Sequence, residues 1–183
     1  MKPELSYSET LDYLYCNLPM FSHIGSAAYR ANLDNIISLC GLLGNPQDRI
    51  QTIHVAGTNG KGSVSHMLAA CYQQAGYRTG LYTSPHLKDF RERIRIGGSM
   101  VEPGFVQDFV GRVRGIAEQV HPSFFEITVA MAFAYFAENQ VEMAIIETGL
   151  GGRLDSTNII VPELSVITNI SFDHQNILGD SLS

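Results

Sequence analysis

Cysteine, charged residues and long apolar runs are all scarce in this sequence of 183 residues. The three cysteines (Cys16, Cys40 and Cys71) are widely spaced and form no C-x-x-C pair, which argues against a disulfide framework or a zinc ribbon. No apolar run reaches about 18 residues, so no membrane-spanning helix is predicted. The first ten residues, MKPELSYSET, lack the apolar segment of a signal peptide. These absences favour a cytoplasmic protein with reduced thiols.

The low charge content is also unevenly distributed. Charged residues make up 16% of the chain and hydrophobic residues 45%, which excludes a disordered or coiled-coil protein and predicts a single folded domain. A net charge of −6 and a pI near 5.4 argue against a nucleic-acid-binding protein. Residues 1–115 carry eleven basic and nine acidic side chains, whereas residues 116–183 carry one basic and nine acidic. This imbalance indicates either that the acidic groups bind a metal ion or that a further segment supplies cations, and it is a first hint of the second.

From residue 51 onward, short apolar runs alternate with helical patterns. The apolar runs predict strands at 51–56, 79–83, 142–147 and 164–168. The helical patterns cover 62–76, 103–120 and 124–139, and residues 93–101 predict a hairpin that turns at Gly97 and Gly98. This alternation is typical of a doubly wound, mostly parallel α/β sheet, whose ligands bind at the carboxyl ends of the strands.

Two helices are predicted before the first strand. Ser6 and Glu9 have the spacing of a capping box, and the helix that they begin is expected to end before Pro19. Apolar residues from Tyr29 to Cys40 recur at helical spacing and predict the second helix.

A glycine-rich segment, GTNGKGS at residues 57–63, follows the first predicted strand. Glycines allow backbone N–H groups to surround a phosphate, the next helix contributes its N-terminal dipole, and Lys61 can reach the terminal phosphates. Gly62 separates Lys61 from Ser63, so the spacing departs from the usual phosphate-binding loop. The alternative is an ordinary strand-to-helix turn. The predicted nucleotide site comprises Gly57, Thr58, Asn59, Gly60, Lys61, Gly62 and Ser63.

A second glycine-rich segment, ETGLGGRLD at residues 147–155, begins with a carboxylate at the end of an apolar strand. A carboxylate in that position is costly unless it is paired or binds a cation. Glu147 therefore predicts a magnesium site, with a salt bridge to Arg153 or another arginine as the alternative.

Other polar residues are less specific. His54 is expected to be a hydrogen-bonded core residue, and His86 and His174, each taken alone, are more typical of structural histidines than of ligands. Lys88, Arg91, Arg93 and Arg95 form a basic cluster. This cluster indicates either a solvated hairpin edge or a surface that attracts an anionic substrate.

Six ordered motifs resemble one known family. The segments IHVAGTNGKGS, YTSPHL, RERIRI, FFEIT, ETGLGGRLDSTN and ITNISFDH are similar to the folylpolyglutamate synthase/dihydrofolate synthase family of the Mur-ligase superfamily. The resemblance implies that Thr58, Asn59, Gly60 and Lys61 bind the phosphates of ATP. It implies that Ser84, Glu147 and His174 bind Mg²⁺, and that Lys61, Glu147 and His174 are the catalytic residues. Two segments are implied to bind the folate substrate: Ser123, Phe124, Phe125 and Glu126, and Leu154, Asp155 and Ser156.

The activity implied by the resemblance is an ATP-dependent ligase of folate biosynthesis and one-carbon metabolism. It joins a folate or dihydropteroate carboxylate to L-glutamate through an acyl phosphate, and the full-length enzyme is expected to be a monomer. Family members are more than twice as long, so residues 1–183 are expected to be the N-terminal part of an incomplete ATP-binding domain that is inactive alone. Two alternatives remain open, which are another Mur-type amide ligase and a non-catalytic nucleotide-binding module.

Overall fold

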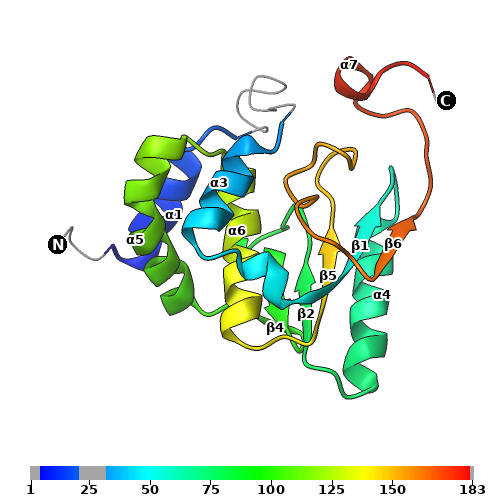
Figure 1. Cartoon of the computed structure of the whole chain (residues 1–183), viewed down its shortest axis with the longest axis horizontal. Helices are drawn as coiled ribbons and strands as arrows, with labels where there is room; N and C mark the ends of the chain where they lie inside the picture. The colour runs from blue at the N-terminus through cyan, green and yellow to red at the C-terminus, as the bar shows by residue number, and fades with distance from the viewer. Residues whose placement is uncertain (1–4, 21–31, 182–183) are drawn as a thin grey trace.

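A six-stranded sheet with helices on both faces forms the centre of the protein (Figure 1). The computed structural model describes residues 5–20 and 32–181. The strands are β1 (Gln51–Ala56), β2 (Thr79–Tyr82), β3 (Ile94–Ile96), β4 (Ser99–Met100), β5 (Met143–Glu147) and β6 (Leu164–Ile167). Their order across the sheet is β4-β3-β2-β5-β1-β6. Strands β2, β5, β1 and β6 are parallel, which confirms the predicted α/β sheet.

The predicted hairpin is present, and it has a role that its local sequence did not indicate. Strand β3 pairs antiparallel with β2, so the hairpin β3–β4 extends the sheet at one edge. This pairing satisfies the backbone groups that β2 would otherwise expose on that side. At the opposite edge lies β6.

The helices form two unequal layers. They are α1 (Tyr7–Cys16), α3 (Asp34–Leu42), α4 (Lys61–Gln74), α5 (Pro103–Val120), α6 (Phe124–Glu138) and α7 (Gln175–Leu178). Helix α4 covers one face of the sheet, and α6 covers the other with α1, α3 and α5 outside it (Figure 1). Eleven of the 15 residues of α6 are buried, because the helix lies between the sheet and the outer helices.

The N-terminal helices agree with the sequence where they are described. The capping box at the start of α1 is present, since the Ser6 hydroxyl accepts from the Glu9 N–H and the Glu9 carboxylate accepts from the Ser6 N–H. Tyr29, from which the second helix was expected to begin, lies outside the described residues. Three short elements were not predicted because they span too few residues to show a period: α7 and the 3₁₀ helices η2 (Pro46–Arg49) and η3 (Phe90–Arg93).

Successive side chains of β1 point to opposite faces of the sheet. Ile53 and Val55 pack in the cluster under α4, with Ala69 of that helix. His54 is paired in register with Ile146 of β5, a residue of the larger cluster on the opposite face. The predicted phosphate-binding segment at residues 57–63, called the phosphate loop below, thus follows a strand that is buried on both sides.

The region around β6 exposes apolar side chains. They are Val161, Leu164, Ile167, Ile170 and Phe172, each more than half exposed. The edge strand β6 and the segments beside it therefore present an apolar surface in the described part of the chain. None of the helices described there is long and apolar enough to span a bilayer.

Candidate nucleotide and folate site

The glycine-rich loop 57–60 connects β1 to the N-terminus of α4, as predicted. Gly60 is the N-cap residue with φ 80°, and Gly57 has φ 135°. The N–H groups of the first helical turn have no intrahelical acceptor, so residues 61–63 present donors to an anion. Ser63 is exposed on this turn.

The segment that follows β6 fastens this loop. The Thr58 N–H donates to the Asn169 carbonyl at 2.9 Å, and the Asn59 N–H donates to Asn169 Oδ1 at 2.9 Å. The Thr168 hydroxyl donates to the Asn59 carbonyl at 2.7 Å, and the Ser171 N–H donates to Thr58 Oγ1 at 3.0 Å. We call residues 168–171 the loop clasp. No local sequence pattern predicts the loop clasp, because the residues that it binds lie more than a hundred positions away.

Lys61 holds its ammonium group against the loop. Nζ donates to the Gly57 carbonyl at 2.7 Å and to the Thr58 carbonyl at 3.3 Å. The side chain is half-buried. This position places a positive charge beside the donors of the helix N-terminus, which suits a polyphosphate.

Glu147 ends β5 beside the same loop. Its residue is 4% exposed, and Oε2 accepts a hydrogen bond from the Ser84 N–H at 3.1 Å. Burial raises the pKa of this carboxyl, and the Ser84 N–H and the charge of Lys61 oppose that rise. A Cβ atom on Gly62 would lie 3.6 Å from Glu147 Oε1, so the helix N-terminus and the carboxylate are close neighbours.

In the part of the chain that the structure describes, Glu147 forms no salt bridge with Arg153 or another arginine, which was the alternative to a magnesium site. Within the described ranges, Asp89 pairs with Arg91 and Glu138 pairs with Arg112, and Asp173 lies close to the ring of His174. Glu147 therefore keeps a buried carboxylate whose charge a cation would offset. A carboxylate and the neighbouring Ser84 hydroxyl are oxygen donors of the kind that Mg²⁺ prefers, so the residues present fit this ion.

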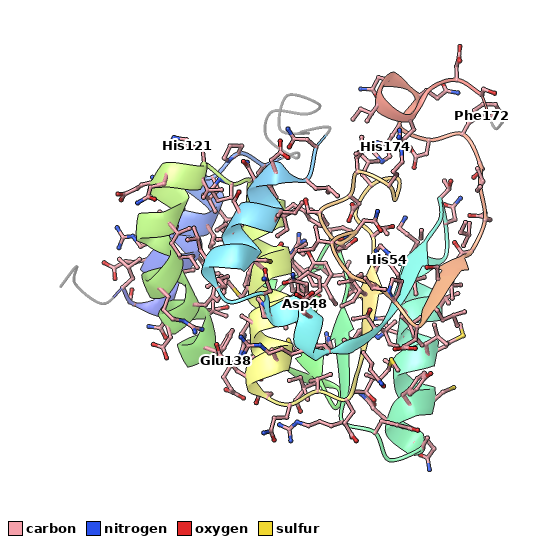
Figure 2. The ribbon with its side chains drawn as sticks, in the orientation of Figure 1. Asp48, His54, His121, Glu138, Phe172 and His174 are labelled. Carbon is pink, nitrogen blue, oxygen red and sulfur yellow. The ribbon has the colours of Figure 1, made fainter. Side chains whose placement is uncertain are left out.

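His174 lies on the carboxyl side of the sheet as N-cap of α7, with φ 47° (Figure 2). Its Nε2 is 3.8 Å from Asp173 Oδ1. No group of three or more His, Cys, Asp and Glu side chains suited to a metal ion occurs in the parts of the chain that are described. Ser84 and Glu147 are thus brought together, whereas the proximity of His174 to Glu147 stays a prediction.

The first predicted folate segment divides into two kinds of residue. Ser123 is the N-cap of α6, and its N–H donates to Glu126 Oε2 at 2.6 Å. Phe124 is 4% exposed and stacks on Tyr15 with ring centroids 5.6 Å apart. Ser123 and Glu126 thus cap the start of α6, and Phe124 packs this helix against α1. Phe125 is only half-buried.

Phe125 meets the second predicted folate segment. A Cβ atom on Gly149 would lie 2.5 Å from Phe125 Cζ and 3.2 Å from Asp155 Oδ2. Asp155 is 4% exposed, and its carboxylate accepts the Gly149 N–H at 2.9 Å and the Leu150 N–H at 2.8 Å. Burial raises the pKa of Asp155, against hydrogen bonds from Thr157 and the loop amides. Leu154 and Ser156 flank Asp155 and are half-buried.

The basic cluster is not a uniformly solvated edge. Arg93 is 8% exposed, its Nε donates to His86 Nδ1 at 2.7 Å, and its guanidinium lies 5.1 Å from the Phe124 ring. His86 Nε2 in turn lies 3.3 Å from the Tyr15 hydroxyl. Burial and the charge of Arg93 lower the pKa of His86. The solvated-edge interpretation is therefore wrong for Arg93, which links the N-terminal helix to the segment after β2.

Comparison with known proteins places this arrangement in a family. Residues 55–181 match the Mur ligase middle domain. The chain is 42% identical over 160 residues to a dihydrofolate synthase/folylpolyglutamate synthase of Bacillus subtilis, covering 84% of this chain and 37% of the relative.

Solved structures agree with this match. An FPGS–AMPPCP–folate complex superposes with a TM-score of 0.87 at 36% identity, over 97% of this chain and 43% of the other. E. coli FolC in complex with DHPP and ADP superposes with a TM-score of 0.88 at 29% identity, over 99% of this chain and 42% of the other. The chain thus spans about two fifths of the length of these proteins. The chain belongs to the Mur ligase family, and its resemblance to the folylpolyglutamate synthase/dihydrofolate synthase branch is confirmed.

Proposed function

We propose that this chain provides the nucleotide and folate sites of an ATP-dependent ligase that joins a folate or dihydropteroate carboxylate to L-glutamate. The observation that carries the proposal is one sheet edge with three features side by side: the phosphate loop with Lys61, the buried Glu147, and the contact between Phe125 and the Gly149–Asp155 loop. The ligands of the similar structures, AMPPCP with folate and ADP with DHPP, support both sites.

The nucleotide phosphates are assigned to the amides of residues 60–63 and to the Lys61 ammonium group. The Thr58 and Asn59 amides are already bound by Asn169, so these two residues shape the loop through the clasp. Magnesium is assigned to Glu147, Ser84 and His174, and when bound it would neutralise charge on the transferring phosphoryl group.

The pterin end of the substrate is assigned to Phe125 and the Gly149–Asp155 loop. A half-buried phenyl ring offers a stacking face, and the glycines let a ligand approach the backbone closely. Ser123, Phe124 and Glu126 would then act on the ligand indirectly, by holding Phe125 at the start of α6.

The chemistry requires no nucleophilic side chain. A carboxylate oxygen of the substrate bonds to the γ-phosphorus of ATP, and ADP leaves. The glutamate amine then attacks the acyl carbon, loses a proton to solvent, and phosphate leaves. Lys61 and the helix amides serve this reaction by holding the phosphates in line and stabilising their charge.

The test is a release assay for ADP with each substrate omitted in turn, run on residues 1–183 and on the complete gene product. We expect ADP release from the complete gene product to require both dihydropteroate and L-glutamate. A preference for an amino-sugar peptide acceptor would instead identify another Mur-type ligase. Nucleotide binding with no turnover on any carboxylate would indicate a binding module.

A further inference from the structure

A buried histidine on β1 is hydrogen-bonded to the loop that follows β5. His54 is 7% exposed, and its Nε2 lies 2.8 Å from Thr157 Oγ1. Figure 2 shows His54 where this loop passes close to β1. The two residues are 103 positions apart in sequence, so the contact joins segments that only the fold brings together.

The direction of each hydrogen bond follows from the number of protons available. The Thr157 hydroxyl donates to Asp155 Oδ1 at 2.5 Å, and it has one proton to give. His54 Nε2 must then be the donor to Thr157 Oγ1, which fixes the neutral ring as the tautomer with the proton on Nε2.

Asp155 is the centre of this network. Oδ1 also accepts the Thr157 N–H at 3.0 Å, and Oδ2 accepts the Gly149 and Leu150 N–H groups. With four donors, the acceptor sites of the carboxylate are filled. The carboxylate therefore closes residues 149–157 into a loop, and His54 anchors that loop to β1.

The strand that carries His54 also carries the phosphate loop, which begins at Gly57 directly after β1. Gly149, at the other end of the network, is the residue against which Phe125 packs. A displacement of the loop by the loss of one hydrogen bond would therefore move the wall of the proposed pterin site, while the phosphate loop keeps its own clasp.

We propose that His54 and Thr157 are positioning residues for the folate end of the site. Through Asp155 they hold residues 149–157 in the conformation that receives the pterin, and they do not act on the nucleotide. This inference rests on the proposed function for its ligand. A histidine and a threonine that merely filled the core would affect folding and both substrates alike.

The experiment compares Thr157→Val, which keeps the shape and removes the hydroxyl, with Thr157→Ser, which keeps the hydroxyl. His54→Leu and His54→Gln form a second pair, because the glutamine amide can still donate. Amide hydrogen exchange is measured on residues 1–183. The KM values for dihydropteroate and for ATP are measured on the complete gene product. We expect Thr157→Val and His54→Leu to raise exchange at Gly149 and Leu150 and to raise KM for dihydropteroate, each about tenfold.

The conservative variants and the KM for ATP provide the controls. Thr157→Ser and His54→Gln should restore most of the protection and the affinity, and KM for ATP should stay within about twofold in all four variants. Unchanged exchange at Gly149 and Leu150, or an equal loss of affinity for ATP, would overturn the proposal. If the wild-type protein used no folate at all, the proposed function would fail, and the proposed folate role would fail with it, whatever the exchange data showed about the loop.

Discussion

At the scale of single residues, the position of Lys61 suits one role, which is to bind the phosphates of the nucleotide. Its ammonium group occupies two carbonyl oxygens of the loop, Gly57 O and Thr58 O, close to the donors of the α4 N-terminus. Because this side chain is only half-buried, we expect that it can be truncated with little effect on packing.

We expect Lys61→Ala to lower kcat of the complete gene product by about 10²- to 10³-fold, because a charge that stabilises the transferring phosphoryl group is lost. The melting temperature should change little. Arg78→Ala is the matched control, since Arg78 is an exposed cation directly before β2, at the amino end of the parallel strands and opposite to the loop. Full activity in a folded Lys61→Ala protein would show that Lys61 is not the phosphate contact.

Within the segment 123–126, substitutions of Ser123 and of Phe125 are expected to differ in their effects on stability and on folate affinity. Ser123→Ala removes an N-cap and should cost about 1 kcal/mol of stability while lowering dihydropteroate affinity less than Phe125→Ala does, because Ser123 acts only through the position of Phe125. Phe125→Ala should weaken dihydropteroate binding about tenfold with a smaller effect on the unfolding midpoint than truncation of buried Phe124. Calorimetric titration and urea unfolding measure the two quantities. An unchanged affinity in Phe125→Ala would remove the ring from the proposed site.

At the scale of elements, the phosphate loop depends on the clasp as well as on its own glycines. Gly57 has φ 135°, and a Cβ atom there would overlap the Thr168 hydroxyl and approach the Asn169 backbone. Gly60 also has a positive φ, 80°, yet a Cβ atom there would meet nothing within 4 Å. A substitution at Gly60 therefore tests backbone strain alone, whereas a substitution at Gly57 adds a steric clash with the clasp.

We expect Gly60→Ala to cost about 1 kcal/mol, the strain of a left-handed residue, and Gly57→Ala to cost about 2 kcal/mol or more because overlap is added. Urea unfolding of both variants gives the comparison. Gly57→Ala should also release the Thr58 and Asn59 amides to faster hydrogen exchange, and Gly60→Ala should not. Equal losses in the two variants would mean that the clasp does not constrain Gly57.

Elements with a local signal were predictable from the sequence. The limits of β1 and α5 agree with the predicted ranges, because an apolar run bounded by glycine and an amphipathic pattern begun by proline are read within a few residues. The pairing of β3 with β2 was not predictable, because it depends on which strand has a free edge. The clasp and the His86–Arg93 contact likewise depend on residues that the fold brings together.

At the scale of the whole molecule, the candidate site is assembled from the ends of several elements. The first turn of α4, after the β1 loop, supplies Lys61, and the loop after β5 supplies Asp155. Ser84 follows the end of β2, and α6 contributes Phe125. The glycine-rich loop with Lys61 and the carboxylate of Glu147 were predicted from their positions at the ends of apolar strands, whereas Ser84, Phe125 and Asp155 were implied only by the family resemblance. The sequence did not identify Thr157 or Asn169, whose roles arise from single hydrogen bonds across the fold.

The central claim is that a substrate carboxylate is activated by phosphorylation at the Lys61 loop before glutamate attacks. The most direct measurement uses dihydropteroate with isotopically labelled carboxylate oxygens, MgATP, L-glutamate and the complete gene product, followed by mass analysis of the released phosphate. The account predicts one labelled oxygen in each phosphate, since the carbon–oxygen bond breaks when the amine displaces the phosphate. Amide product accompanied by unlabelled phosphate would contradict it.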